Sequence, residues 1–374
     1  MKVPFNRLTI SGKEFEYMRS AAEGGQLHGD GRLTAACHGL LAKMTGCAMP
    51  LLTTSCTSAL DMAAILCSIR PGDEVIMPSY TFVSTANAFA LRGAKIVWCD
   101  IREDTANIDE TLIEPLITGR TRAIVPVHYA GVACEMDAIM GIAKRHSLAV
   151  VEDAAQGICS SYRGRALGSI GDFGALSFHG TKNLTCGEGG AILVNNPEAE
   201  FRACVVREKG TNRTEFMQGK ADKYTWVDYG SSFLPSELSA GYLLAQLENA
   251  GSITRDRLAA WDFYFARLAP LADAGMLKLP TVPEGCAHNA HIFYFLARSA
   301  GDARRILAHM KERGVGAASH YVPLHSSPMG MKVSEPATLP VCDSVAARLV
   351  RLPIFSSISR EEQEYVCASL EECF

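Results

Sequence analysis

The sequence predicts an α/β fold with a large domain, in which a mostly parallel sheet lies between helices, and a smaller C-terminal α/β domain. Short apolar runs alternate with helical stretches between residues 50 and 153, a pattern typical of a parallel sheet that is covered on both faces. The alternation restarts after Pro280, and 374 residues are enough for two such units. We therefore expect a large domain over residues 1–250 and a small domain over residues 251–374.

The expected elements follow one another along the chain. Strands are predicted from runs rich in Val, Ile and Leu, and helices from apolar residues three or four apart. The predicted strands cover residues 50–54, 74–78, 95–99, 122–127, 148–153, 174–177, 191–194 and 291–296. The predicted helices cover residues 33–44, 58–66, 83–91, 109–117, 136–146, 198–207, 236–247, 256–271 and 303–312, with a last helix from residue 360. Residues 208–229 are predicted as a polar segment, and residues 318–321 as a strand or a loop.

Composition and charge argue against several partners and compartments. The net charge is −4 and no basic run is sustained, which argues against nucleic acid or an anionic membrane as the main partner. The first residues contain no apolar signal core, and no stretch reaches the roughly 18 to 20 apolar residues of a spanning helix. The 13 cysteines form no C-x-x-C pair. We therefore expect reduced thiols, no metal site and a cytoplasmic protein.

A lysine between two apolar strands is the central feature of the sequence. An apolar run ends at Ser177, Lys182 follows five residues later, and a glycine cluster over residues 187–190 precedes the next strand. Lysine is almost never fully buried without a partner. A Schiff base to the aldehyde of pyridoxal phosphate is one chemistry that needs a lysine in such a place. The alternative is a loop lysine in solvent.

Asp153 supplies a second part of such a site. It ends the apolar strand 150–153, and a carboxylate there can pair with a protonated pyridine nitrogen and keep the ring an electron sink. The alternative role is a helix N-cap, which Asp also favours. In a parallel sheet the ligand lies at the carboxyl ends of the strands, where both Asp153 and Lys182 are expected.

Hydroxyl and aromatic side chains complete the predicted cofactor site. The run Thr54-Ser55-Cys56-Thr57-Ser58 joins a strand to a helix, and hydroxyls with free N–H groups at a helix start can hold a phosphate. Ser177 could add a further hydroxyl. Phe82 follows a strand end and could stack on the cofactor ring. Simple helix capping and plain core packing are the alternatives.

Other polar residues give weaker signals. His128 and His179 end apolar runs, where a histidine is more often structural than catalytic. Lys209 and Arg213 could bind a diphosphate, although a solvated loop explains them equally well.

Five longer runs together resemble the DegT-type sugar-nucleotide aminotransferases, and the resemblance covers nearly the whole chain. These runs are residues 72–97, 122–137, 150–157 (VVEDAAQG), 177–190 (SFHGTKN followed by GEGG) and 207–213 (REKGTNR). The resemblance implies a fold-type I pyridoxal-phosphate enzyme. It further implies L-glutamate as the amino donor and an obligate homodimer with active sites at the subunit interface.

The resemblance also implies roles for individual residues. Lys182 would carry the cofactor covalently, Asp153 would pair with its ring nitrogen, and Gln156 would lie beside the ring. Phe82 would stack on the ring. Thr57, Ser58 and Ser177 would hold the phosphate. Apart from the resemblance, Lys209, Arg213, His320 and Tyr321 are candidate substrate-binding residues.

One departure from the family pattern concerns contact between subunits. Family members often carry an Asn and an Arg in a G-x-N-x-R run, and this Asn reaches the cofactor phosphate of the neighbouring subunit. Here the run covers residues 230–234, with Ser232 in the place of the Asn and Leu234 in the place of the Arg. The hydroxyl of Ser232 could make the same contact.

Two strings, residues 209–213 and 222–226, are similar to the family members that aminate C4 of dTDP-4-dehydro-6-deoxy-D-glucose. The product of those enzymes is dTDP-4-amino-4,6-dideoxy-D-galactose, which is used for lipopolysaccharide O-antigen or enterobacterial common antigen. The alternatives are an aminotransferase for another nucleotide keto sugar (at C3, or UDP-linked), a sugar dehydratase, and a non-catalytic sensor. Dehydratase relatives replace the lysine with histidine, whereas Lys182 is present here.

Overall fold

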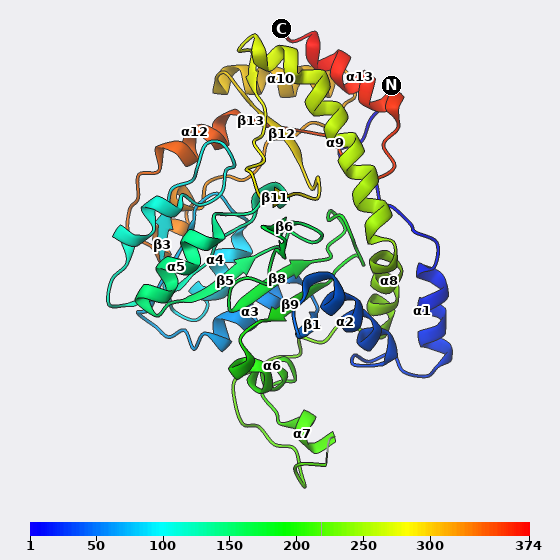
Figure 1. The fold of residues 1–374 in the computed structure, drawn as a ribbon, viewed down its shortest axis with the longest axis vertical. Coiled ribbons are helices and arrows are strands. Elements are labelled where there is room, and N and C mark those ends of the chain that lie inside the picture. Colours follow the sequence, from blue (N-terminus) through cyan, green and yellow to red (C-terminus); the bar gives the residue numbers. More distant parts are fainter. Residues whose placement is uncertain (218) are drawn as a thin grey trace.

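The computed structural model describes residues 1–217 and 219–374, and a seven-stranded sheet forms its centre (Figure 1). The strand order is β1-β9-β8-β5-β4-β2-β3. Strands β8, β5, β4, β2 and β3 pair in parallel, whereas β9 is antiparallel to both of its neighbours. The predicted α/β class with a mostly parallel, mixed sheet is therefore confirmed. The strands are β1 (Met49–Thr53), β2 (Glu74–Pro78), β3 (Lys95–Cys99), β4 (Thr121–Ile124), β5 (Ala149–Asp153), β8 (Phe173–Ser177) and β9 (Gly190–Val194).

Helices cover both faces of this sheet because its strands are apolar on both faces. Val150 belongs to one buried apolar cluster and Val151 to another, as the alternation of side chains along a strand requires. The cluster that contains Val151 includes α3 (Cys56–Leu66), α4 (Val83–Ala90) and α6 (Glu200–Arg207). The cluster that contains Val150 includes α1 (Glu14–Glu23), α2 (Arg32–Thr45), α5 (Met136–His146) and α8 (Glu237–Glu248).

A second, antiparallel sheet with the strand order β10-β12-β13 lies at the end of the molecule where both termini are found (Figure 1). The 24-residue helix α9 (Ala250–Asp273) leads to it from α8. Val3 belongs to the core of this region and pairs with Val315. The division into two domains at residue 250 stays a prediction. The elements here are β10 (Leu277–Lys278), β12 (Phe293–Ala297), α10 (Ala300–Glu312), η5 (Leu324–Ser326), α11 (Gly330–Val333), α12 (Pro340–Arg348), β13 (Leu349–Leu352) and α13 (Arg360–Glu371).

Residues 208–217 and 219–232 form an arm that leaves the body at the end opposite the termini (Figure 1). It carries α7 (Arg213–Met217), and Thr211 pairs with Trp226 along it. Trp226 is 76% exposed and Met217 is 69% exposed. The segment predicted as polar therefore contains a short helix and large exposed apolar side chains.

Short elements account for most of the differences from the predicted order. The helix predicted over residues 109–117 is instead two 3₁₀ turns, because Pro115 has no N–H for a helical hydrogen bond. Residues 318–321 are a loop apart from a bridge between Ala318 and Arg351. None of the described helices is long and apolar enough to span a bilayer. The remaining short elements are η1 (Glu110–Leu112), η2 (Glu114–Leu116), η3 (Tyr129–Gly131), β6 (Ser161–Tyr162), β7 (Arg165–Ala166), η4 (Pro197–Ala199) and β11 (Cys286–Ala287).

Candidate active site

A cavity of about 680 Å³ lies where the parallel strands of the central sheet end, the usual ligand position in such sheets. One wall comes from the ends of β1, β2, β5 and β8. The other comes from the N-terminal segment and the C-terminal sheet. The lining residues with polar or aromatic side chains include Phe5, Asn6, Ser55, Cys56, Thr57, Phe82, Asp153, Gln156, Ser177, His179, Lys182, Arg257, His291, His320, Tyr321 and Arg351.

Lys182 lies in the connection between β8 and β9 and lines this cavity. Hydrogen bonds from Phe178 N to Gly189 O and from Lys182 N to His179 O, both 2.9 Å long, close the connection. Among the described residues, no carboxylate lies within ion-pair distance of Lys182. Burial lowers the pKa of Lys182, so a larger fraction is neutral than for a lysine in water. The neutral amine is the form that attacks an aldehyde.

The glycine run before β9 allows the start of α3 to pack against the sheet. A Cβ atom on Gly190 would lie 2.3 Å from the carbonyl carbon of Ser55, so a side chain does not fit there. Ser55 is the N-cap of α3, and its Oγ accepts a hydrogen bond from Ser58 N at 3.0 Å. The N–H groups of Cys56 and Thr57 find no acceptor in the described chain. A helix start with free N–H groups is an anion site that suits a phosphate.

Ser55, Thr57, Ser84 and Ser177 bring hydroxyl groups to the cavity near this helix start, where Thr57 Oγ1 lies 2.7 Å from Ser84 Oγ. Ser58 does not line it. The Ser58 hydroxyl lies 2.7 Å from Thr54 Oγ1 and 3.0 Å from Ser55 Oγ, and these contacts hold it on the helix cap. Among the serines of the cap it is Ser55, rather than the predicted Ser58, that lines the cavity.

Asp153, the last residue of β5, lines the cavity with a carboxylate that no cation among the described residues balances. The residue is 5% exposed. Its Oδ2 accepts a hydrogen bond from Thr85 Oγ1 at 2.6 Å, and its Oδ1 accepts one from Ala155 N at 3.1 Å. In the part of the chain that the structure describes, no Lys, Arg or His lies within ion-pair distance of it. A buried carboxylate is costly without a positive partner, so this group suits a ligand with a protonated ring nitrogen.

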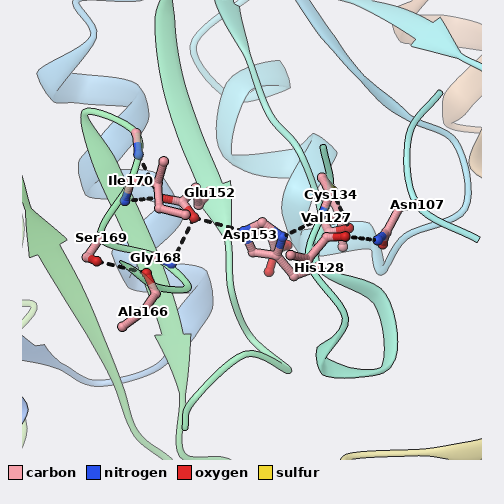
Figure 2. Close-up of polar contacts among 12 residues, drawn as sticks. Asn107, Val127, His128, Cys134, Glu152, Asp153, Ala166, Gly168, Ser169 and Ile170 are labelled. Carbon is pink, nitrogen blue, oxygen red and sulfur yellow. Dashed lines mark hydrogen bonds and ion pairs between the residues drawn. The ribbon is translucent and has the colours of Figure 1, made fainter. Parts of the chain in front are cut away.

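Glu152, one residue earlier, lies on the other side of β5 and is fully hydrogen-bonded (Figure 2). Its two oxygens accept hydrogen bonds from three backbone N–H groups of residues 168–171 at 2.6–2.8 Å. His128 Nε2 lies 2.8 Å from Glu152 Oε2. His128 Nδ1 accepts a hydrogen bond from Cys134 N at 3.1 Å, so Nε2 carries the ring proton and donates a hydrogen bond to Glu152. This network holds the backbone of β5 from behind the cavity.

Phe82 and Gln156 lie beside the place where a ring would bind. Phe82 is 56% exposed and lines the cavity, with its ring centre 6.3 Å from that of Tyr321. Gln156 Nε2 donates a hydrogen bond to the Tyr321 hydroxyl at 3.0 Å, and Gln156 Oε1 accepts one from Ala130 N at 2.6 Å. An open aromatic face beside a buried carboxylate suits a flat heteroaromatic ring.

His320 and Tyr321 bring neutral polar groups to the same cavity. Their rings stack with centres 3.8 Å apart, and His320 Nδ1 lies 2.6 Å from the Tyr129 hydroxyl. Burial, with the charges of Arg351 and Lys182, lowers the pKa of His320 from 6.5 to about 2. The imidazole is therefore neutral near pH 7, and it can hydrogen-bond an uncharged substrate group such as a hydroxyl.

Three predicted site residues lie outside the cavity, in the arm. Lys209 Nζ lies 3.0 Å from Glu208 Oε2, and Arg213 Nη1 lies 2.8 Å from Glu208 Oε1. Ser232 is exposed and pairs with Glu208 through the main chain. None of the three lines the cavity of its own chain, so their predicted roles require a second subunit.

Among the lining residues that were not found from the sequence are Phe5, Asn6, Arg257, His291 and Arg351. They come from segments that lie far in sequence from the lysine run, and no local motif marks them. Only the folding of the C-terminal sheet and the N-terminal segment over the central sheet brings them to the site.

The residues of the cavity fit pyridoxal phosphate. A lysine without a counter-ion can bind its aldehyde, the unbalanced carboxylate of Asp153 can pair with its ring nitrogen, and the start of α3 can hold its phosphate. No group of three or more His, Cys, Asp or Glu among the described residues is arranged to hold a metal ion.

Comparisons with known proteins identify one family along almost the entire chain. The model of the DegT/DnrJ/EryC1/StrS aminotransferase family matches residues 9–371. The uncharacterised protein MJ1066 of Methanocaldococcus jannaschii is 31% identical over 331 residues, which are 86% of this chain and 85% of that protein. Among solved structures, DesV from S. venezuelae is 29% identical with a TM-score of 0.89, and 99% of this chain and 98% of that chain are covered. An aminotransferase from Psychrobacter cryohalolentis is 25% identical with a TM-score of 0.93 and the same coverage.

The family match includes the lysine run, the β5 carboxylate and the helix start that the cavity brings together. Enzymes of this family depend on pyridoxal phosphate. The protein is therefore an aminotransferase that uses pyridoxal 5′-phosphate, and it belongs to the DegT/DnrJ/EryC1/StrS aminotransferase family.

Proposed function

We propose that the enzyme transfers the amino group of L-glutamate to the C4 ketone of dTDP-4-dehydro-6-deoxy-D-glucose. The product is dTDP-4-amino-4,6-dideoxy-D-galactose, an amino sugar for a surface glycan of the enterobacterial common antigen or O-antigen type. The observation that carries the transfer chemistry is that one cavity holds the Lys182 amine and the Asp153 carboxylate, neither of which has an ion-pair partner in the described chain. The choice of sugar rests on the resemblance of residues 209–213 and 222–226.

The chain's own residues supply proton transfer and positioning. When bound, pyridoxal phosphate supplies an aldehyde that exchanges amines and a ring that withdraws electrons from the adjacent carbon. Lys182 Nζ, as a neutral amine, accepts the proton from the α carbon of L-glutamate and delivers a proton to C4 of the sugar in the second half of the cycle. Asp153 accepts a hydrogen bond from the protonated ring nitrogen. The side chains of Thr57 and Ser177, with the α3 N-terminus, hold the phosphate.

The remaining side chains of the cavity orient the reactants. Phe82 provides a face against which the cofactor ring stacks, and Gln156 fixes Tyr321 beside it. His320 and Tyr321 donate or accept hydrogen bonds at the hydroxyls of the sugar. The His320 ring is neutral. It therefore adds no positive charge that would attract the phosphate groups of the substrate.

We also propose a homodimer with shared active sites, in the cytoplasm. The arm over residues 208–217 and 219–232 exposes Met217, Trp226 and Tyr229, and exposed apolar groups of this size are typical of protein interfaces. Docked on a second copy, the arm would bring Ser232 to the partner's phosphate site, and Lys209 and Arg213 to the diphosphate of the substrate. Trp226→Ser should weaken the dimer roughly 10- to 100-fold in sedimentation equilibrium. A wild-type protein that sediments as an active monomer would contradict this arrangement.

A substrate panel tests the proposed reaction. The enzyme loaded with pyridoxal phosphate is incubated with L-glutamate and each of several dTDP- and UDP-linked 3-keto and 4-keto sugars, and the products are identified by mass spectrometry and NMR. We expect the dTDP-linked C4 ketone to be converted fastest, with the new amine in the galacto configuration. A clear preference for a UDP-linked or C3 substrate would overturn the proposed sugar and leave the aminotransferase chemistry intact.

A further inference from the structure

A second cavity, of about 540 Å³, lies where the arm leaves the body beside α6 (Figure 1). It shares no lining residue with the active-site cavity. Its walls come from four segments that are distant in sequence: the loop after α3, the end of α4, α6 and the base of the arm. Its volume lies within the range of small-molecule sites. The cavity is therefore a candidate for a second binding site.

Three arginines and one carboxylate line this second cavity. Arg202 Nε donates a hydrogen bond to Asp228 Oδ2 at 2.6 Å, and Arg202 Nη1 donates one to Ser68 Oγ at 2.9 Å. The other oxygen of Asp228 accepts a hydrogen bond from Tyr229 N at 2.6 Å. Arg202, with a smaller contribution from Arg92, lowers the pKa of Asp228, so this carboxylate is ionised near pH 7. Asp228 thus balances the charge of Arg202.

The other two arginines, Arg70 and Arg92, have no counter-ion. No Asp or Glu lies within ion-pair distance of either guanidinium in the part of the chain that the structure describes. The Nε atom of Arg92 is buried and finds no acceptor among the described residues. The guanidinium carbon of Arg92 lies 5.0 Å from the centre of the Tyr229 ring. A buried donor on a charged group costs free energy when it has no acceptor, and an anionic ligand removes that cost.

We propose that the second cavity binds a diphosphate group, either free or as part of a nucleotide. Arginine forks match the oxygens of phosphate groups, and a diphosphate carries enough negative charge to balance both Arg70 and Arg92. A single carboxylate carries one negative charge and would leave one of them unbalanced. Because the arginines belong to the body, whereas Asp228 and Tyr229 belong to the arm, the bound group lies at the junction of the two.

The test is isothermal titration calorimetry of the enzyme loaded with pyridoxal phosphate, so that the cofactor's own phosphate site is already filled. Pyrophosphate is the first probe. We expect its Kd to rise at least 10-fold in Arg92→Gln. Arg70→Gln should raise the Kd less, roughly 3-fold, because the Arg70 side chain is exposed. An exposed substitution of this kind does not endanger folding, and unchanged cofactor absorbance in Arg92→Gln would show that this variant is folded as well.

Arg145→Gln is the matched control, because Arg145 is an exposed arginine that pairs with Glu114 and does not line the second cavity. It should bind pyrophosphate as the wild type does. The Arg213→Gln variant separates this site from the proposed position of the substrate diphosphate. Loss of pyrophosphate binding in Arg213→Gln with retention in Arg92→Gln would overturn the proposal. A wild-type enzyme that does not bind millimolar pyrophosphate would overturn it too.

A second probe, dTDP, distinguishes the two sources of a diphosphate group. Binding of dTDP that is tighter than that of pyrophosphate, with the difference lost in Arg92→Gln, would support the cavity as a nucleotide site. Equal dependence of both probes on Arg92, with equal affinities, would support it as a site for a free diphosphate. Binding of both probes that does not depend on Arg92 or Arg70 would contradict either version.

Discussion

The two sides of the central sheet at the end of β5 place adjacent carboxylates in opposite surroundings. Behind the strand, Glu152 is satisfied by three backbone N–H groups and by His128 (Figure 2). In front of it, Asp153 accepts two hydrogen bonds and lines a cavity. Both side chains are buried. A saturated buried charge holds the fold, whereas one that lacks a counter-ion marks a place for a ligand.

The buried and cavity-lining basic residues also divide into those that have a carboxylate partner and those that have none. Arg207 is 5% exposed, with Nε donating to Leu52 O at 2.8 Å and Nη1 lying 2.7 Å from Asp30 Oδ1. Lys182 and Arg351 line the cavity and have no carboxylate partner among the described residues. The comparison predicts that substitutions in front of β5 impair the cofactor and the reaction, and that substitutions behind it impair stability.

The largest expected effect comes from Lys182→Ala. Without this amine neither covalent attachment of the cofactor nor proton transfer at the α carbon of the donor is possible, so turnover should fall by at least ~10³-fold. The measurement is product formation by mass spectrometry at saturating substrates. The thermal midpoint of the cofactor-free protein should not fall, because the Lys182 side chain makes no hydrogen bond in the described chain. Near-normal transfer by this variant would refute the assigned base.

Asp153→Asn should have the next largest effect and should also act on the reaction. Losing the charge opposite the ring nitrogen should lower kcat roughly 10²- to 10³-fold and weaken cofactor binding. Asn can still accept from Ala155 N and can donate to Thr85 Oγ1, so the cofactor-free protein should lose less than about 1 kcal/mol of unfolding free energy. Cofactor affinity is measured by equilibrium dialysis. If stability falls and cofactor affinity does not change, Asp153 belongs with Glu152 as a structural residue.

Glu152→Gln tests the other side of the strand. The amide NH₂ of Gln would face the N–H of His128 or of Gly168, and two donors cannot satisfy each other. We expect the unfolding free energy of the cofactor-free protein to fall by about 1–3 kcal/mol. The measurement is urea unfolding at a fixed protein concentration.

Glu335→Gln is the control for this variant, since Glu335 forms an exposed ion pair with Lys95, and such pairs contribute about 0–1 kcal/mol. A Glu152→Gln protein as stable as the wild type, with weaker cofactor binding, would remove the distinction between the two sides of β5.

The sequence was most informative where local pattern alone decides the structure. The bounds of β2 (Glu74–Pro78), β3 (Lys95–Cys99) and α5 (Met136–His146) agree with the predicted ranges. These segments have clear apolar periodicity, and turn residues bound them. Two-residue strands such as β6 and β10 were not predicted, because their pairing depends on partners that lie far along the chain.

The residues of the candidate site also fall into two groups: those that local sequence marks and those that only the fold brings together. Asp153, Ser177 and Lys182 each follow or end an apolar run, so the rule that ligands bind at strand ends brought them together before the structure was known. Arg351 and Phe5 come from opposite ends of the chain, and nothing in their local sequence indicates that they meet. Local sequence does not separate Ser55 from Ser58. Both carry a hydroxyl at the cap of α3, and only the structure shows that Ser55 is the one that lines the cavity.

The smallest effect we predict concerns His320 and acid pH. Burial lowers the pKa of His320 from 6.5 to about 2 in the folded protein, so the unfolded chain binds more protons between these pH values. The contribution of this residue to stability is therefore complete above pH 6.5 and is lost progressively as the pH falls toward 2.

Replacing His320 by Gln should flatten the decline in unfolding free energy by about 1–2 kcal/mol between pH 6.5 and 5. His179→Gln, at an exposed position on the cavity rim, should leave the decline unchanged. An identical decline in the His320→Gln and wild-type proteins would mean that the imidazole is protonated in the folded state, and the cavity would then contain one more cation than its contacts indicate.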